Sequence, residues 1–213
     1  MGKKDRKLTK AEEKRKKIYE EEKKKLIDAG YAEKDLTIGV VYANVMAFVL
    51  GLPIIIVLGI LFFKYYNMKS YYMSFIFTMK ESIIFLIALL VLIVVHELIH
   101  GAFWAIFAKN HLKSIEFGFM VQYLTPYCCC KEVLTRGQYI IGGIMPTVLL
   151  GLIPAVVAIF SSSWLVFVIG CIMILSGGGD MTIVLKLLMY RSDKQEILYM
   201  DHPYECGLVV FER

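Results

Sequence analysis

The chain has 213 residues, of which 58% are apolar and 20% charged, and its mean hydropathy is +0.61. The charges are concentrated at one end, since residues 1–35 hold 13 of the 24 Lys and Arg residues and 9 of the 19 Asp and Glu residues. A soluble domain spreads its charges over its whole surface. This distribution therefore excludes a soluble enzyme and predicts a polar tail followed by a membrane body.

The net charge of +5 does not indicate nucleic-acid binding, because the basic residues of the tail alternate with acids and lack interspersed aromatics. Three of the five cysteines are consecutive, at positions 128–130. Adjacent cysteines cannot easily bridge one another, so we expect free thiols in a reducing compartment. The first apolar run starts near residue 38 and is too long for a cleavable signal peptide. We therefore expect the membrane segments to be retained.

A charged helix is expected first, within the N-terminal segment 1–36. Thr9 and Glu12 form a capping-box pattern, and good helix formers continue to Gly30. Apolar residues make only a thin stripe among many Lys and Glu. We expect this helix to be solvated or to rest on lipid headgroups.

Four apolar runs then predict an all-α membrane core over residues 37–190, followed by a tail at 191–213. Each run is long enough to cross a hydrocarbon layer of about 30 Å. The runs cover residues 38–63, 82–108, 139–160 and 164–189. Only three serines separate the last two runs, which predicts an antiparallel hairpin of helices. The segment 64–81, rich in Tyr and Met, suits a membrane interface.

The distribution of Lys and Arg predicts how the chain is oriented in the cell membrane. If the tail is cytoplasmic, 21 of the 24 basic residues lie inside, and only Lys64, Lys69 and Lys80 lie outside. Both termini are then cytoplasmic. The cysteine triplet also faces the cytosol, in agreement with free thiols.

The second run contains the sequence HELIH, with His96, Glu97 and His100. On a helix, residues at i and i+4 project from one face about 6 Å apart, so the two imidazoles can share one metal ion. Two imidazoles and one carboxylate leave the fourth tetrahedral position of Zn²⁺ for a water molecule. Glu97 is then the general base. A packed histidine is the alternative, but three ionisable groups within five residues of a membrane span favour a functional site.

A third ligand has to come from elsewhere, because Phe103 and Ile106 stand where the usual soluble pattern has Gly and His. The candidates are Glu116, His111, Asp180, Asp201 and His202. The expected depth in the membrane, counted from the first basic residue after each span, favours Asp180. Asp180 lies 11 residues before Arg191, and the two histidines lie 13 and 9 residues before Lys109. All three then lie at about the same level in the membrane. The preceding glycines, 177–179, can serve close helix packing, loosen the helix, or do both.

These motifs together resemble the site-2-protease type of intramembrane metalloprotease, and more closely a zincin-peptidase family of bacterial membrane proteins. The resemblance covers residues 82–213 and rests on four short runs: HELIHG at 96–101, YCCCKE at 127–132, GGGD at 177–180 and DHP at 201–203. In site-2 proteases the Asp lies in a longer pattern and is followed by Gly, whereas Met181 follows Asp180 here. Zinc ligation by Asp180 is therefore inferred from the resemblance and from depth together.

The loop between the second and third spans is the expected substrate platform. Residues 114–123 are rich in β-formers and predict a strand or hairpin, and 207–211 predict another strand. An edge strand near the metal can hold a peptide by main-chain hydrogen bonds, whereas an interfacial cover for the helices is the alternative. The cysteine triplet is expected to be idle rather than to bind a second metal.

Other residues of the first and third spans and of the loop between the second and third spans have packing, access or oxyanion-stabilising roles as their expected functions. The first span has Asn44 as its main polar group and is expected to serve packing. Glycines and prolines in the third span are compatible with a lateral path to the metal or with packing alone. Asn110 and His111 are candidates for stabilising the oxyanion.

These features predict a zinc-dependent intramembrane metalloprotease that holds one Zn²⁺ through His96, His100 and Asp180, with Glu97 as base. Its expected substrate is a membrane protein or peptide cleaved near the cytoplasmic side of the lipid bilayer. The alternatives are a metal-binding membrane protein without hydrolytic activity, such as a sensor or a partner-binding protein, and a transporter. A transporter is disfavoured because the four spans offer few relay groups and no inverted repeat.

Overall fold

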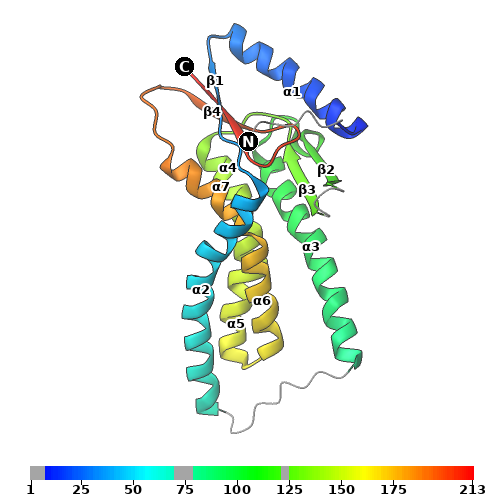
Figure 1. Cartoon of the computed structure of the whole chain (residues 1–213), viewed down its shortest axis with the longest axis vertical. Helices are drawn as coiled ribbons and strands as arrows, with labels where there is room; N and C mark the ends of the chain where they lie inside the picture. The colour runs from blue at the N-terminus through cyan, green and yellow to red at the C-terminus, as the bar shows by residue number, and fades with distance from the viewer. Residues whose placement is uncertain (1–7, 70–78, 121–124) are drawn as a thin grey trace.

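The computed structural model describes residues 8–69, 79–120 and 125–213 (Figure 1). Most of these residues are helical. The helices are α1 (Lys10–Asp28), α2 (Val40–Lys69), α3 (Met79–Phe107), η1 (His111–Ser114), α4 (Arg136–Pro146), the π-helical η3 (Thr147–Leu152), α5 (Ile153–Ser161), α6 (Trp164–Ser176) and α7 (Gly178–Met189). The strands are β1 (Ala32–Asp35), β2 (Ile115–Met120), β3 (Thr125–Cys130), β4 (Ile197–Asp201) and β5 (Leu208–Glu212).

Three helical segments are long and apolar enough to cross a membrane, namely Val40–Tyr65, Ser82–Phe107 and Arg136–Ser161. The third of them is continuous through α4, η3 and α5. These segments agree with the first three predicted spans and with a multi-pass membrane protein. Half of the interface predicted at 64–81, residues 70–78, lies outside the described residues, and the other half belongs to the end of α2 and the start of α3.

The fourth predicted span is not one straight helix. Its two halves, α6 and α7, meet at Gly177 with a bend of 49° and count as a single crossing only if they are taken together. Successive glycines are poor helix formers and allow such a kink. The bend places Asp180 in the first turn of α7.

Close contacts between helices hold this apolar body together. At the crossing of α2 and α7, a side chain on Gly178 would place its Cβ 2.1 Å from Ala47 Cβ and 2.3 Å from Ala47 Cα. Only glycine permits this approach. The outer faces of α2 and α3 carry exposed apolar side chains, among them Val41, Val45 and Leu90. Such faces are suited to contact with lipid.

Two small antiparallel sheets lie at one end of the helices (Figure 1). The first has the order β1-β5-β4, and the second is the β2–β3 hairpin, paired from Ile115 with Cys130 to Met120 with Thr125. The predicted hairpin and the predicted strand at 207–211 correspond to β2 and β5, although residues 121–124 lie outside the described part. Strands β1 and β4 were not expected, and the cysteine triplet forms the end of β3.

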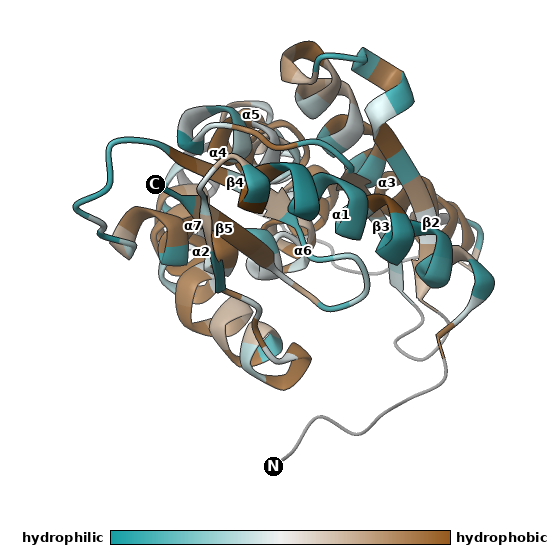
Figure 2. Ribbon diagram, turned by 90° about the horizontal axis from the view of Figure 1, so that it is seen from above, coloured by the Kyte–Doolittle hydropathy of each residue, from teal (hydrophilic) through white to brown (hydrophobic). Residues whose placement is uncertain are grey.

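Helix α1 is docked on these sheets rather than fully solvated. The predicted capping box is present, with the Glu12 backbone N–H donating to Thr9 Oγ1 and the Thr9 backbone N–H donating to Glu12 Oε2. Tyr19 is buried in a cluster with Met200, Val209 and Phe211. In the view from above, the hydrophilic ribbon of α1 runs across the strands (Figure 2). Most residues of α1 are exposed, as expected for a charged helix, and its three buried residues, Glu12, Arg15 and Tyr19, mark the side that contacts the sheets.

We refer to α1, the two sheets and the β4–β5 loop (residues 202–207) as the cap. The body consists of the helices α2, α3, α4, η3, α5, α6 and α7. Segments from both ends of the chain join in the cap, because β1 and β4 both pair with β5.

Candidate metal centre

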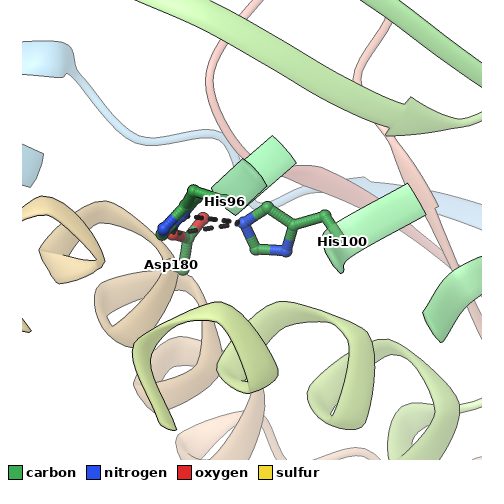
Figure 3. A group of neighbouring side chains, drawn as sticks. All are labelled: His96, His100 and Asp180. Carbon is green, nitrogen blue, oxygen red and sulfur yellow. Dashed lines mark hydrogen bonds and ion pairs between the residues drawn. The ribbon is translucent and has the colours of Figure 1, made fainter. Parts of the chain in front are cut away.

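Three side chains converge where α3 passes the start of α7 (Figure 3). His96 Nε2 lies 3.1 Å and His100 Nε2 3.4 Å from Asp180 Oδ2, and the two Nε2 atoms are 3.2 Å apart. Both imidazoles are buried. One turn of α3 supplies both histidines, and the glycine bend before α7 turns the carboxylate toward them. The three residues selected from the sequence by helical spacing and depth thus meet in space.

The spacing of these three donor atoms fits a zinc ion. Zinc bonds of about 2.0–2.1 Å in a tetrahedron separate neighbouring ligand atoms by roughly 3.3 Å. The observed separations of 3.1, 3.4 and 3.2 Å are close to this value. Two imidazoles and one carboxylate are also an ordinary zinc ligand set. The group is therefore close enough to bind one metal ion.

His100 is oriented by its surroundings. Its Nδ1 lies 2.8 Å from the Gly142 carbonyl oxygen, which can only accept, so Nδ1 carries the proton and Nε2 keeps its lone pair for a metal. Trp104 stacks on the ring at 5.1 Å, and its Nε1–H donates to the Tyr139 carbonyl oxygen. A Cβ on Gly142 would lie 2.1 Å from the indole, so this packing requires glycine. The ring is thus held in the orientation that a metal ligand needs.

Glu97 lies beside the ligands, where a general base is required. It is half-buried and lines the same cavity as both histidines. The backbone N–H of Cys128 donates a hydrogen bond to its carboxylate. Strand β3 therefore runs directly past Glu97.

A cavity of about 420 Å³ contains the metal group between body and cap. The body contributes residues of α2, α3, α4 and α7 and one residue of α6. The cap contributes β3, the β4–β5 loop and one residue each of α1, β2 and β4. Asn44 and Arg15 are two polar lining residues for which the sequence did not indicate a role at the site. Asn44 is a lone amide in an apolar helix, and Arg15 is one of 13 basic residues in its segment, so neither had a spacing signal.

Asp201 joins the cap to the body at the cavity wall. It accepts hydrogen bonds from the Tyr139 hydroxyl and, at 2.7 Å, from the Cys130 backbone N–H. Burial raises the pKa of this carboxyl to about 6. Although Asp201 lines the cavity, it lies outside the group of three that could hold a metal.

The other candidate ligands have different partners. His202 lines the cavity, but its Nδ1 accepts the backbone N–H groups of Tyr204 and Glu205 at 3.4 and 2.9 Å. Glu116 forms an ion pair with Arg15 at 3.5 Å, and His111 Nδ1 lies 3.0 Å from the Ala105 carbonyl oxygen.

The predicted oxyanion candidates are also placed elsewhere. Asn110 donates to Glu132 at 2.5 Å, and neither Asn110 nor His111 lines the cavity. The sequence-based suggestion for these two residues was therefore wrong, because the turn that holds them packs against the end of β3.

All five cysteines are free, as expected. Burial raises the pKa of Cys130 to about 12 and that of Cys206 to about 11. Thiols with such values stay protonated and are poor nucleophiles. Within residues 8–69, 79–120 and 125–213, His96, His100 and Asp180 form the one group with metal-ligand spacing. The structure therefore gives no support for a second metal at the cysteine triplet.

Fold and site together define a multi-pass membrane protein with a candidate metal centre between its helices and its cap. Residues 89–194, about half of the chain, match the model of a family described as "Putative zincin peptidase", and the chain belongs to this family. The matched segment holds all three candidate ligands and Glu97. No curated protein and no solved structure matches the chain.

Proposed function

We propose that this protein is a zinc-dependent intramembrane metalloprotease that hydrolyses a peptide bond of a membrane-protein substrate near the cytoplasmic side of the bilayer. The observation that carries the proposal is the convergence of His96, His100 and Asp180 beside Glu97 in a cavity between body and cap. Membership of a zincin-peptidase family supports the same reaction class.

The catalytic roles follow from the chemistry of these side chains. His96, His100 and Asp180 would hold the ion, which when bound acts as a Lewis acid and lowers the pKa of water toward about 7. Glu97 accepts the proton of the attacking water and delivers it to the nitrogen of the leaving amine. The Cys128 N–H holds the carboxylate of Glu97 in place for both transfers.

Strand β3 is the substrate platform in this proposal. Backbone groups alternate in direction along a strand, and the N–H groups of Cys128 and Cys130 point away from β2, to Glu97 and Asp201. The free edge of β3 therefore faces the cavity. The outward N–H groups of Cys128 and Cys130 are engaged, and Pro126 has none, so an extended peptide adds to this edge by donating its own N–H groups to the outward carbonyl oxygens of β3. A peptide bound in this way lies next to Glu97.

The orientation of the chain is part of the proposal. The excess of Lys and Arg in α1 and in the segments that flank the cap places the cap and both termini in the cytoplasm. The metal group then lies at the cytoplasmic end of the membrane body.

The decisive experiment compares Glu97→Gln with the wild type. Full-length protein in liposomes is assayed against a panel of transmembrane peptides, and its zinc content is measured. We expect a chelator to stop cleavage by the wild type and zinc to restore it. Glu97→Gln should keep its zinc and lose cleavage by roughly 10²–10⁴-fold, the usual contribution of a general base.

Glu196→Gln is the matched control, because Glu196 is exposed, pairs with Tyr31 and Arg213 and does not line the cavity. It should cleave like the wild type. Undiminished cleavage by Glu97→Gln would contradict the mechanism. Zinc binding without cleavage of any peptide by the wild type would favour a metal-binding protein that is not an enzyme.

A further inference from the structure

Helix α2 turns one face toward the metal centre. Val40, Ala43, Asn44 and Ala47 have the spacing i, i+3, i+4, i+7, which places them on one side of a helix. The first three line the cavity, and the fourth lies against Gly178 of α7. The side of α2 that carries Asn44 is therefore the side that faces the site.

Asn44 lies at the level of the ligand Asp180. Chain direction in α2 runs away from the cap, and in α7 it runs toward the cap (Figure 1). From the contact between Ala47 and Gly178, Asn44 is three residues nearer to the cap on α2, and Asp180 is two residues nearer on α7. Both residues therefore lie on the cap side of this contact and within one helical turn of it. Both line the same cavity.

The Asn44 amide is uncommitted in the described part of the chain. No hydrogen bond joins it to a described residue, and it is the only amide side chain between Val40 and Phe63. A carboxamide has two N–H donors, and a polar group inside a membrane helix is costly unless it has a function. Three other donors of the cavity wall are already engaged: the Tyr139 hydroxyl with Asp201, the Trp104 indole with the Tyr139 carbonyl, and Arg15 Nε with the Pro203 carbonyl.

We propose that Asn44 is a catalytic residue whose amide donates a hydrogen bond to the carbonyl oxygen of the scissile bond. This inference rests on the proposed metalloprotease function and names a substrate contact within it. Asn44 approaches the substrate from α2, whereas Glu97 and the histidines approach it from α3.

The donor acts at the step in which charge develops. Water oxygen forms a bond to the carbonyl carbon, the π electron pair moves to the carbonyl oxygen, and the water proton goes to Glu97. The electron pair on that oxygen then re-forms the C=O bond as the C–N bond breaks, and the amine nitrogen leaves with the C–N electron pair and with the proton that Glu97 delivers. A hydrogen bond from Asn44 strengthens as the carbonyl oxygen becomes negative, so it stabilises the transition state more than the bound substrate.

The test measures binding of two inhibitors by zinc-loaded, full-length protein in detergent. A leucine-based phosphinate dipeptide presents a tetrahedral anionic centre, whereas a small hydroxamate needs the metal alone. Asn44→Leu keeps the size of the side chain and removes both donors. We expect its phosphinate affinity to fall roughly 100-fold, the lower end of the effect of one oxyanion donor. Its zinc content and hydroxamate affinity should equal those of the wild type.

Asn44→Ala provides a second variant of smaller volume, and it should show the same selective loss. Asn110→Leu is the matched control, because it removes an amide outside the cavity and should leave both affinities unchanged. Wild-type phosphinate affinity in both Asn44 variants would overturn the role of Asn44 and leave the metalloprotease intact. Equal losses for both inhibitors would also overturn it, because they indicate a deformed cavity. A wild-type protein that binds zinc but neither inhibitor would overturn the proposed function and the role of Asn44 together.

Discussion

Different interactions stabilise the interior of the body and the interior of the cap. In the body, apolar helices meet at close contacts such as that of Gly178 with Ala47, and shape complementarity decides the arrangement. In the cap, an apolar cluster around Phe211 is supplemented by polar pairs: Glu212 accepts hydrogen bonds from Lys34 Nζ at 2.5 Å and from the Tyr190 hydroxyl at 2.6 Å. The body should therefore respond mainly to changes in side-chain volume, whereas the cap should respond to changes in charge as well.

The metal centre lies at the junction of the two regions. All three candidate ligands and Glu97 belong to the body, whereas β3 and the β4–β5 loop close the cavity from the cap. Damage to the body should change metal binding. Damage to the cap should change access to a metal site that remains intact.

The largest effect is expected from Gly178→Ala, because the new Cβ would collide with the backbone of α2. Overpacking of this kind lowers the free energy of unfolding by about 1–3 kcal/mol. The zinc content should also fall, since Asp180 is only two residues away. Gly179→Ala is the matched control, because a Cβ there meets no atom within 4 Å. Thermal unfolding in detergent and metal analysis measure both effects, and equal stability of the two variants would refute the importance of this contact.

An intermediate effect is expected from Arg15→Ala in the cap. The buried guanidinium donates from Nε to the Pro203 carbonyl at 2.8 Å, pairs with Glu116 and stacks on the Tyr127 ring at 4.3 Å. Loss of a charged hydrogen bond of this kind costs about 1.5–3 kcal/mol locally. Hydrogen exchange should accelerate in α1 and in the β4–β5 loop, while the zinc content stays unchanged.

Lys17→Ala serves as the control for Arg15, since Lys17 lies on the exposed face of the same helix. It should leave hydrogen exchange as in the wild type. Loss of zinc from Arg15→Ala would show that the cap also shapes the metal centre, and the separation of the two regions would fail.

The smallest effect is a pH dependence of the cap. Lys34, followed by Tyr190, lowers the pKa of Glu212 from its ordinary 4.5 to about 2. A carboxylate whose pKa is lower in the folded state stabilises that state above pH 4.5, and the contribution is lost as the pH falls toward 2. Because Lys34 is 53% exposed, we expect less than about 1 kcal/mol. Glu212→Gln should reduce the change in the free energy of unfolding between pH 4.5 and pH 2. Glu13→Gln, at an exposed position, should leave that change as in the wild type. If Glu212→Gln also leaves it unchanged, the ion pair does not stabilise the cap.

The sequence predicts the body better than the cap, for a physical reason. Long apolar runs can only be spans, so three of them agree closely with helical segments of the structure, whereas the break at Gly177 depends on packing that hydropathy does not record. Strand β1 has the sequence AEKD, and all four of its residues are exposed. Such a segment has no apolar alternation, and it becomes a strand only because β5 offers it an edge.

Some residues of the candidate site are predictable from the sequence, and others are not. His96, Glu97 and His100 follow from helical spacing, and Asp180 from its matching depth, because these relations are local or set by the membrane. Asn44 and Arg15 reach the cavity through the crossing of α2 with α7 and through the docking of α1. No local pattern predicts a contact that only the tertiary fold creates.

The order of strands in the cap has a consequence for how the protein is made. Strand β5 is the central strand of its sheet, yet residues 208–212 follow every span in the sequence. During synthesis β1 therefore waits unpaired while more than 170 further residues are added and the helices enter the membrane. The cap sheet is completed last, so a ribosome that stalls before residue 208 leaves a chain that holds all the candidate metal ligands but lacks the central strand of that sheet.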